Sequence, residues 1–279
     1  MTVRRLWLLV RVGLAGLAFL SFWIGGLGLV LLAFPWARWR HRRAGPLERA
    51  AACQRWVQRA FRALHDYMRA CGLLHFQPRA VDPRTPGRRF VLVANHPTLV
   101  DVVALSAVYG RLTCAAKAPL FRTPVVGQIL RACGYLDGGD GDAFAGAAVV
   151  SQALDRLAGE MPVLVFPEGT RSPVGGLHAF KRGAFEIACR ADAPVLPVLI
   201  RCEPPALGKG RPWYDIPSST ASFTVTPLAE MNPRDFDRDA SRMAAQCEAM
   251  YRRRLGLSPA ESTPAPVAPA RSARQNVGT

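Results

Sequence analysis

Several features that define other protein classes are absent from this sequence. The seven cysteines form no CxxC pair and no Cys/His cluster at the spacing of a zinc site, so no bound metal is predicted. Their odd number and irregular spacing favour reduced thiols in a domain that faces the cytosol. The GxSxG elbow that activates a serine nucleophile is also missing, which argues against a serine hydrolase.

Acidic residues are scarce in the first 80 positions, which hold 13 arginines but only Glu48 and Asp66. This region therefore supplies an excess of 11 positive charges out of a net charge of +16. Such a basic region predicts a polyanionic partner, either nucleic acid or an anionic membrane surface. Because the charge lies beside an apolar segment and no stacking-aromatic motif accompanies it, we favour the membrane and expect no nucleic acid.

Charge of either sign is missing from residues 12–34. At about 1.5 Å per residue, a helix of this length crosses a hydrocarbon core of about 30 Å. Arg4, Arg5 and Arg11 precede it, and the larger group of arginines after it favours a cytoplasmic location for the following domain. A re-entrant or interfacial hairpin and a buried helix of a soluble protein are the alternatives. A membrane location, the inner or cytoplasmic membrane, is expected.

A second helix is predicted at residues 48–71, where apolar residues recur every three or four positions. Arg55, Arg59, Arg62 and Arg69 occupy the other side. A basic amphipathic helix after a membrane segment is typical of an interfacial helix on an anionic surface. The alternative is an ordinary packed helix with one solvated face.

Beyond a Pro/Arg-rich connector at residues 77–89, short apolar runs alternate with helical patterns. Strands are predicted at residues 90–94, 112–116, 163–166, 195–200 and 222–226. Helices are predicted at residues 123–133, 142–158, 179–190 and 239–255. This order predicts an α/β fold with a mixed, largely parallel central sheet flanked by helices, preceded by an N-terminal membrane helix. The expected regions are a membrane anchor with basic flanks (1–46), an interfacial helix (47–76), an enzymatic domain (77–257) and a disordered tail (258–279).

The first motif with a chemical meaning is Asn95-His96-Pro97, which ends a buried strand and is followed by Asp101. Pro97 suits the first position of a helix, which would make His96 the N-cap and bring Asp101 back toward the imidazole. The pair then resembles a general base with an orienting carboxylate. A histidine that is merely hydrogen-bonded in a turn is the alternative.

The second motif is the PEGTR sequence that follows the strand at residues 163–166. Since sites form at the carboxyl ends of parallel strands, this loop and His96 are expected at one edge of the sheet. Gly169 allows close approach of a ligand, and Arg171 can grip a phosphate or carboxylate. Lys181 and Arg182 add charge at a predicted helix start. Alone, such a loop is more often a surface turn with a salt-bridged arginine.

Together the two motifs resemble those of the glycerolipid acyltransferases, the PlsC-like lysophospholipid acyltransferase family. Asn95-His96 through Asp101 matches the NHx4D motif, residues 166–171 match FPEGTR, and residues 195–198 resemble a fourth motif. The resemblance implies transfer of a fatty acyl group from acyl-CoA or acyl carrier protein to the hydroxyl of a lysophospholipid. It implies His96 as general base and Asp101 as its orienting partner, with no cofactor. The substrate-binding residues it implies are Asn95, Lys117, Glu168, Gly169, Thr170, Arg171 and Lys181.

One segment departs from the family pattern. The second motif usually contains an arginine that helps bind the acceptor phosphate, and here that position falls near Asp140. Asp137 and Asp142 make the loop more acidic, and carboxylates repel a phosphate. This predicts an acceptor with a neutral or cationic head, such as an amino-acid lipid, a glycolipid or an aryl lipid. In the alternative, Arg171, Lys181 or Arg182 holds the phosphate and the acidic loop points to solvent. A non-catalytic lipid-binding scaffold is a further possibility.

Overall fold

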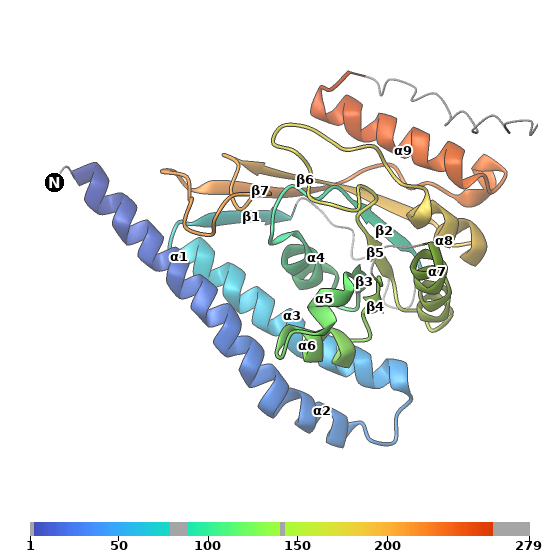
Figure 1. The fold of residues 1–279 in the computed structure, drawn as a ribbon, viewed down its shortest axis with the longest axis horizontal. Coiled ribbons are helices and arrows are strands. Elements are labelled where there is room, and N and C mark those ends of the chain that lie inside the picture. Colours follow the sequence, from blue (N-terminus) through green and yellow to red (C-terminus); the bar gives the residue numbers. More distant parts are fainter. Residues whose placement is uncertain (1–2, 79–88, 140–142, 259–279) are drawn as a thin grey trace, which may run out of the picture.

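The computed structural model describes residues 3–78, 89–139 and 143–258, which contain a seven-stranded sheet (Figure 1). The strand order is β1-β7-β6-β2-β5-β3-β4. Only the β6–β7 pairing is antiparallel among the described strands, which confirms a mixed, largely parallel sheet. The strands are β1 (Leu74–Pro78), β2 (Val91–Ala94), β3 (Thr113–Ala116), β4 (Leu136–Asp137), β5 (Val163–Val165), β6 (Val195–Glu203) and β7 (Ala221–Pro227).

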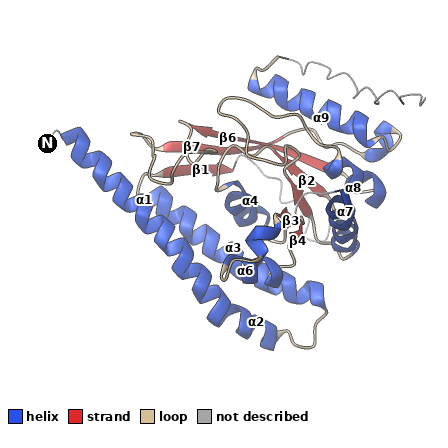
Figure 2. Cartoon of the chain, viewed as in Figure 1, coloured by secondary structure: helices blue, strands red, loops and turns tan. Residues whose placement is uncertain are grey.

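Helices cover both faces of the sheet (Figure 2). Alternate residues of β2 serve opposite faces, as the two-residue period of a strand requires. Val91 and Val93 belong to a core shared with α7 (Ala143–Ala158), α8 (Gly183–Ala191) and α9 (Ala240–Leu255). Leu92 and Ala94 belong to the core on the other face, with α3 (Pro46–Ala70) and α4 (Asp101–Tyr109). The short helices α5 (Ala118–Phe121) and α6 (Val126–Ala132) follow β3, and a 3-10 turn, Pro233–Phe236, precedes α9.

The first strand of the sheet was missed by the sequence analysis. The expected opening strand at residues 90–94 is β2, whereas β1 precedes it and pairs in parallel with β7. The expected domain boundary at residue 77 therefore falls inside β1. The pattern Leu74-His75-Phe76-Gln77 does alternate, but it is too short to separate from the end of a helix by periodicity alone. Most of the connector (79–88) and of the tail (259–279) lies outside the described residues.

The apolar N-terminal segment is one long helical element. Helix α1 (Val3–Gly28) continues through a π-helical turn, Leu29–Ala33, into α2 (Phe34–Arg40). Residues 5–40 form the one described element that is long and apolar enough to cross a membrane, with a mean hydropathy of 2.3 in its most apolar window. Only 22% of that window is buried. Exposed side chains include Leu9, Leu20, Ile24, Leu31 and Leu32.

Helix α3 runs back beside α1 (Figure 1). The Phe22 and Phe61 rings stack with centroids 6.4 Å apart, and the Tyr67 hydroxyl donates to the Leu14 carbonyl at 3.0 Å. The apolar side of α3 is therefore packed inside the protein, as in the packed-helix alternative. Arg55, Arg59 and Arg69 remain exposed on its outer side.

Arg11 does not act as the freely exposed flanking cation that the sequence suggested. It is 2% exposed, and its guanidinium donates to the carbonyls of Gly72 (2.9 Å), Ser219 (3.0 Å) and Pro217 (3.2 Å). These three bonds tie α1 to the turn after α3 and to the loop before β7. Backbone carbonyls accept from the buried guanidinium here, so the buried charge is not left without hydrogen-bond partners.

Candidate active site

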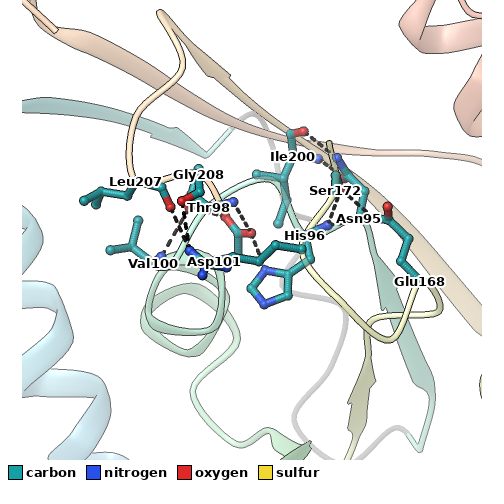
Figure 3. A network of polar contacts seen from close by, with 11 residues as sticks. Asn95, His96, Thr98, Val100, Asp101, Glu168, Ser172, Ile200, Leu207 and Gly208 are labelled. Carbon is teal, nitrogen blue, oxygen red and sulfur yellow. Dashed lines mark hydrogen bonds and ion pairs between the residues drawn. The ribbon is translucent and has the colours of Figure 1, made fainter. Parts of the chain in front are cut away.

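The His96–Asp101 pair forms as the motif predicted, but with a different backbone. Helix α4 begins at Asp101, so the expected helix start at Pro97 with His96 as N-cap is wrong. The Asp101 carboxylate accepts from the Thr98 amide (2.8 Å) and the Thr98 hydroxyl (2.5 Å), which holds residues 98–100 in a turn. The His96 Nδ1 and Asp101 Oδ2 atoms lie 2.7 Å apart (Figure 3).

Burial controls the electrostatics of this pair. Asp101 is fully buried, and this raises the pKa of its carboxyl, while the hydrogen bonds from His96 and Thr98 act against the rise. The His96 side chain is 20% exposed and stacks on Phe166 with ring centroids 4.2 Å apart. A proton on Nδ1 satisfies Asp101, and Nε2, which bonds to no described residue, is then free to accept a proton.

The PEGTR loop docks directly on the His96 loop, as expected for the ends of the adjacent parallel strands β2 and β5. The Ser172 amide donates to the His96 carbonyl at 2.8 Å. The His96 amide donates to Glu168 Oε1 at 3.1 Å, and the Ser172 hydroxyl donates to the same oxygen at 2.5 Å. The convergence of the two motifs is confirmed.

Two residues expected to bind substrate are instead used inside the protein. The Asn95 side chain accepts from the Ile200 amide (2.7 Å) and donates to the Ile200 carbonyl (2.9 Å), which fastens the loop to β6. Glu168 also accepts from the His178 amide at 2.8 Å. Each is 3% exposed and neither lines the cavity described next. Both residues hold the loops of the two motifs in place.

A cavity of about 1270 Å³ opens beside His96. The other expected binding residues line it together: Lys117, Gly169, Thr170, Arg171 and Lys181. Gly169 has φ +68°, and a Cβ there would lie 3.0 Å from the Lys181 ammonium nitrogen. A side chain at this position would therefore crowd the cation that covers the loop.

Lys209 is a lining residue that the sequence analysis missed. It comes from the loop between β6 and β7, and its ammonium donates to the Thr170 hydroxyl at 3.0 Å. The Arg171 guanidinium donates to the carbonyls of Gly208 (3.0 Å) and Leu207 (3.3 Å), which holds this loop against the site. No motif surrounds Lys209, so only the folded chain reveals its position.

The rest of the cavity is apolar and extends away from His96 between helices. Its wall includes Phe22 and Leu29 from the N-terminal helical element, Phe61 and Leu64 from α3, and Ile129 from α6. The N-terminal apolar element therefore forms part of the site. Asp137 does not line the cavity; it is exposed and accepts from the Gly139 amide at 3.0 Å. Asp140 and Asp142, the other members of the acidic loop, lie outside the described residues.

An oxyanion formed beside His96 would need hydrogen-bond donors, and the backbone amides near Gly169 and just after His96 are the nearest candidates in the two motifs. The Leu99 amide donates to the Leu207 carbonyl (3.0 Å), and the Gly169 amide donates to the Phe166 carbonyl (3.0 Å). The Thr98 and Val100 amides are also engaged. Within the described chain, the amides of Thr170 and Arg171 make no hydrogen bond, so these two remain available.

Comparison with known proteins finds similarity to acyltransferases. The family model described as Acyltransferase matches residues 75–201. The human 1-acyl-sn-glycerol-3-phosphate acyltransferase alpha is 34% identical over 41% of this chain and 41% of its own length. The human beta enzyme is 31% identical over 52% of this chain and 50% of its own length. The enzyme of the same name from Chlamydomonas reinhardtii is 32% identical over 41% of this chain.

The matched region spans only 35% of the length of the algal enzyme and 41% of the length of the human alpha enzyme. A solved structure extends the likeness in fold. The crystal structure of the 1-acyl-sn-glycerophosphate acyltransferase PlsC from Thermotoga maritima covers 91% of this chain and 97% of its own, with a TM-score of 0.68 at 19% identity.

Proposed function

We propose that the chain belongs to the PlsC-like acyltransferase family and that it transfers a fatty acyl group from a thioester donor to the hydroxyl of a lysophospholipid. The donor is acyl-CoA or acyl carrier protein. One observation carries this proposal: a His–Asp pair with a free Nε2 lies at a cavity whose wall is largely apolar and also holds a group of cations. These are the parts needed to hold an acyl chain, a phosphate and a reacting hydroxyl together.

The reaction follows from the free nitrogen of His96. Nε2 takes the proton of the acceptor hydroxyl while its oxygen attacks the thioester carbonyl, forming a C–O bond and a tetrahedral intermediate. The intermediate then collapses, the C–S bond breaks, and the imidazolium returns its proton to the departing thiolate. Asp101 stabilises the imidazolium in between. General-base catalysis of this kind supplies about 10²–10⁴-fold in rate.

The oxyanion of the intermediate needs hydrogen-bond donors close to His96. The unengaged amides of Thr170 and Arg171 suit this role, because their loop is bonded to the His96 loop. No acyl-enzyme is needed, since the thiolate is a good leaving group.

The cations around His96 favour a phosphate-bearing acceptor. Lys117, Arg171, Lys181 and Lys209 all line the cavity, and together they would repel a cationic headgroup. Among the described residues, no acidic side chain lines it. The predicted neutral or cationic acceptor is therefore less favoured than 1-acyl-glycerol-3-phosphate, the acceptor in the relatives' names.

The exposed apolar face of α1 and α2 suits contact with a membrane. A crossing perpendicular to the bilayer is disfavoured, because α3 lies along α1 and its exposed Arg55, Arg59 and Arg69 would enter hydrocarbon. An interfacial helix that lies along one leaflet avoids this cost. The seven free cysteines fit a catalytic domain on the reducing, cytoplasmic side.

Thiol release from palmitoyl-CoA in the presence of 1-acyl-glycerol-3-phosphate tests the proposal. His96→Ala should lower the rate by at least 10²-fold, while a matched control, the exposed His75→Ala, should retain it. Equal rates in wild type and His96→Ala would refute catalysis by this pair and favour a lipid-binding scaffold. Faster turnover of a neutral acceptor than of the phosphate acceptor would refute the phosphate assignment.

A further inference from the structure

A second pocket, separate from the catalytic cavity, contains four arginines. It has a volume of about 410 Å³ and lies where α2, α3, α6 and the end of α7 meet. Its lining includes Arg38, Arg49, Arg131 and Arg156. Helix α6 separates the two spaces, since its Ile129 lines the catalytic cavity and its Arg131 lines this one.

The arginines differ in how firmly they are held. Arg156 Nε donates to the Gly134 carbonyl at 3.0 Å, and Arg131 donates to the Phe121 carbonyl at 2.5 Å. Each keeps further N–H groups unused. The side chains of Arg38 and Arg49 make no hydrogen bond to any described residue, so their guanidinium groups can close on a ligand. Two fixed cations and two adaptable ones suit an oxyanion with several acceptor oxygens.

Negative charge that would neutralise this pocket is missing from the described part of the chain. The acidic residues nearest in sequence are Glu48, Asp155 and Glu160. None of them lines the pocket, and none forms an ion pair with these arginines. Four like charges around one small space repel one another, and an anion relieves that repulsion.

We propose that this pocket binds a phosphate group, and that an anionic phospholipid headgroup of the membrane supplies it. Arg38 lies between Trp36 and Trp39, which are 52% and 62% exposed at the end of the apolar element. Exposed tryptophans prefer the headgroup level of a bilayer. The pocket would then lie at the depth of lipid phosphates, on a face distinct from the catalytic cavity.

Vesicle binding of the full chain tests this inference. The test variant is Arg38→Gln/Arg49→Gln, which changes only side chains that make no hydrogen bond within the described chain. The control variant, Arg253→Gln/Arg254→Gln, removes the same charge from the exposed end of α9. Helix α9 covers the opposite face of the sheet from α3. Binding to vesicles with 30% phosphatidylglycerol should weaken about 30-fold in the first variant, as roughly 1 kcal/mol per arginine implies. Binding to pure phosphatidylcholine and binding by the α9 variant should not change. If vesicle binding weakens equally in both variants, the loss comes from net charge rather than from this pocket, and the proposal is overturned.

The second source of phosphate, the 3′-phosphate of CoA, is tested with 3′,5′-adenosine diphosphate by calorimetry. If the first variant loses this binding and keeps vesicle binding, the phosphate site stands and the lipid assignment is overturned. His96→Ala should bind vesicles like wild type, because the pocket does not include the catalytic pair. Failure of the lipid-binding proposal and failure of the acyl-transfer proposal can therefore be told apart.

Discussion

The contribution of Asp101 can be isolated by replacing its carboxylate with an amide. In Asp101→Asn the amide oxygen can occupy the Oδ2 position and still accept from His96 Nδ1 and the Thr98 amide. The amide nitrogen then occupies the Oδ1 position, and the Thr98 hydroxyl can accept from it. The variant therefore preserves the geometry and removes the negative charge, which separates orientation from charge stabilisation.

The magnitude follows from the type of bond that is lost. A 2.7 Å contact between His96 and a fully buried carboxylate becomes a charge-assisted hydrogen bond when the imidazolium forms. Such bonds contribute about 1.5–3 kcal/mol, which corresponds to about a 10- to 150-fold fall in kcat. Asp101→Ala, which also loses orientation, should fall further, toward the His96→Ala rate.

Thiol-release kinetics at saturating acceptor, with thermal melting to verify folding, provide the measurement. If Asp101→Asn retains more than one third of wild-type kcat while folded, the charge of Asp101 does not assist the base. If the two variants Asp101→Asn and Asp101→Ala have the same kcat, orientation of the His96 imidazole by Asp101 does not contribute to the rate.

Three further outcomes are expected elsewhere in the molecule. Lys209→Gln should raise KM for the phosphate acceptor about fivefold with kcat nearly unchanged, and an unchanged KM would remove Lys209 from the binding group. His65 is buried against Phe76, and burial lowers its pKa to about 4, so the unfolded chain binds protons first as pH falls. Stability should therefore drop by about 2 kcal/mol between pH 7 and pH 5 in denaturant titrations, and His65→Phe should reduce that slope; an equal slope would contradict this. Asn95→Ala leaves both backbone groups of Ile200 buried without their partner, so unfolding free energy should fall by about 2–4 kcal/mol. A melting temperature within 2 °C of wild type would exclude that role.

Local patterns predicted most of the secondary structure. Runs such as residues 90–94 and 163–166 became the buried strands β2 and β5, because a fully buried parallel strand requires continuous apolar residues. The two motifs after these strands met at one edge, because adjacent parallel strands end on the same side. The start of α4 was predicted at Pro97 but lies at Asp101, because the hydrogen bonds from Thr98 to the Asp101 carboxylate keep residues 98–100 in a turn.

The sequence alone determined the chemical groups of the site: a histidine with a carboxylate partner, a loop that carries an arginine, and an apolar segment. Tertiary structure alone decided which residues turn inward. Asn95 and Glu168 belong to the binding motifs by sequence, yet both are buried in hydrogen bonds that hold the loops. Lys209 reaches the site, and Arg11 becomes buried, through contacts between residues far apart in the chain. Periodicity encodes burial along one element, whereas these contacts depend on how separate elements pack, which no local pattern specifies.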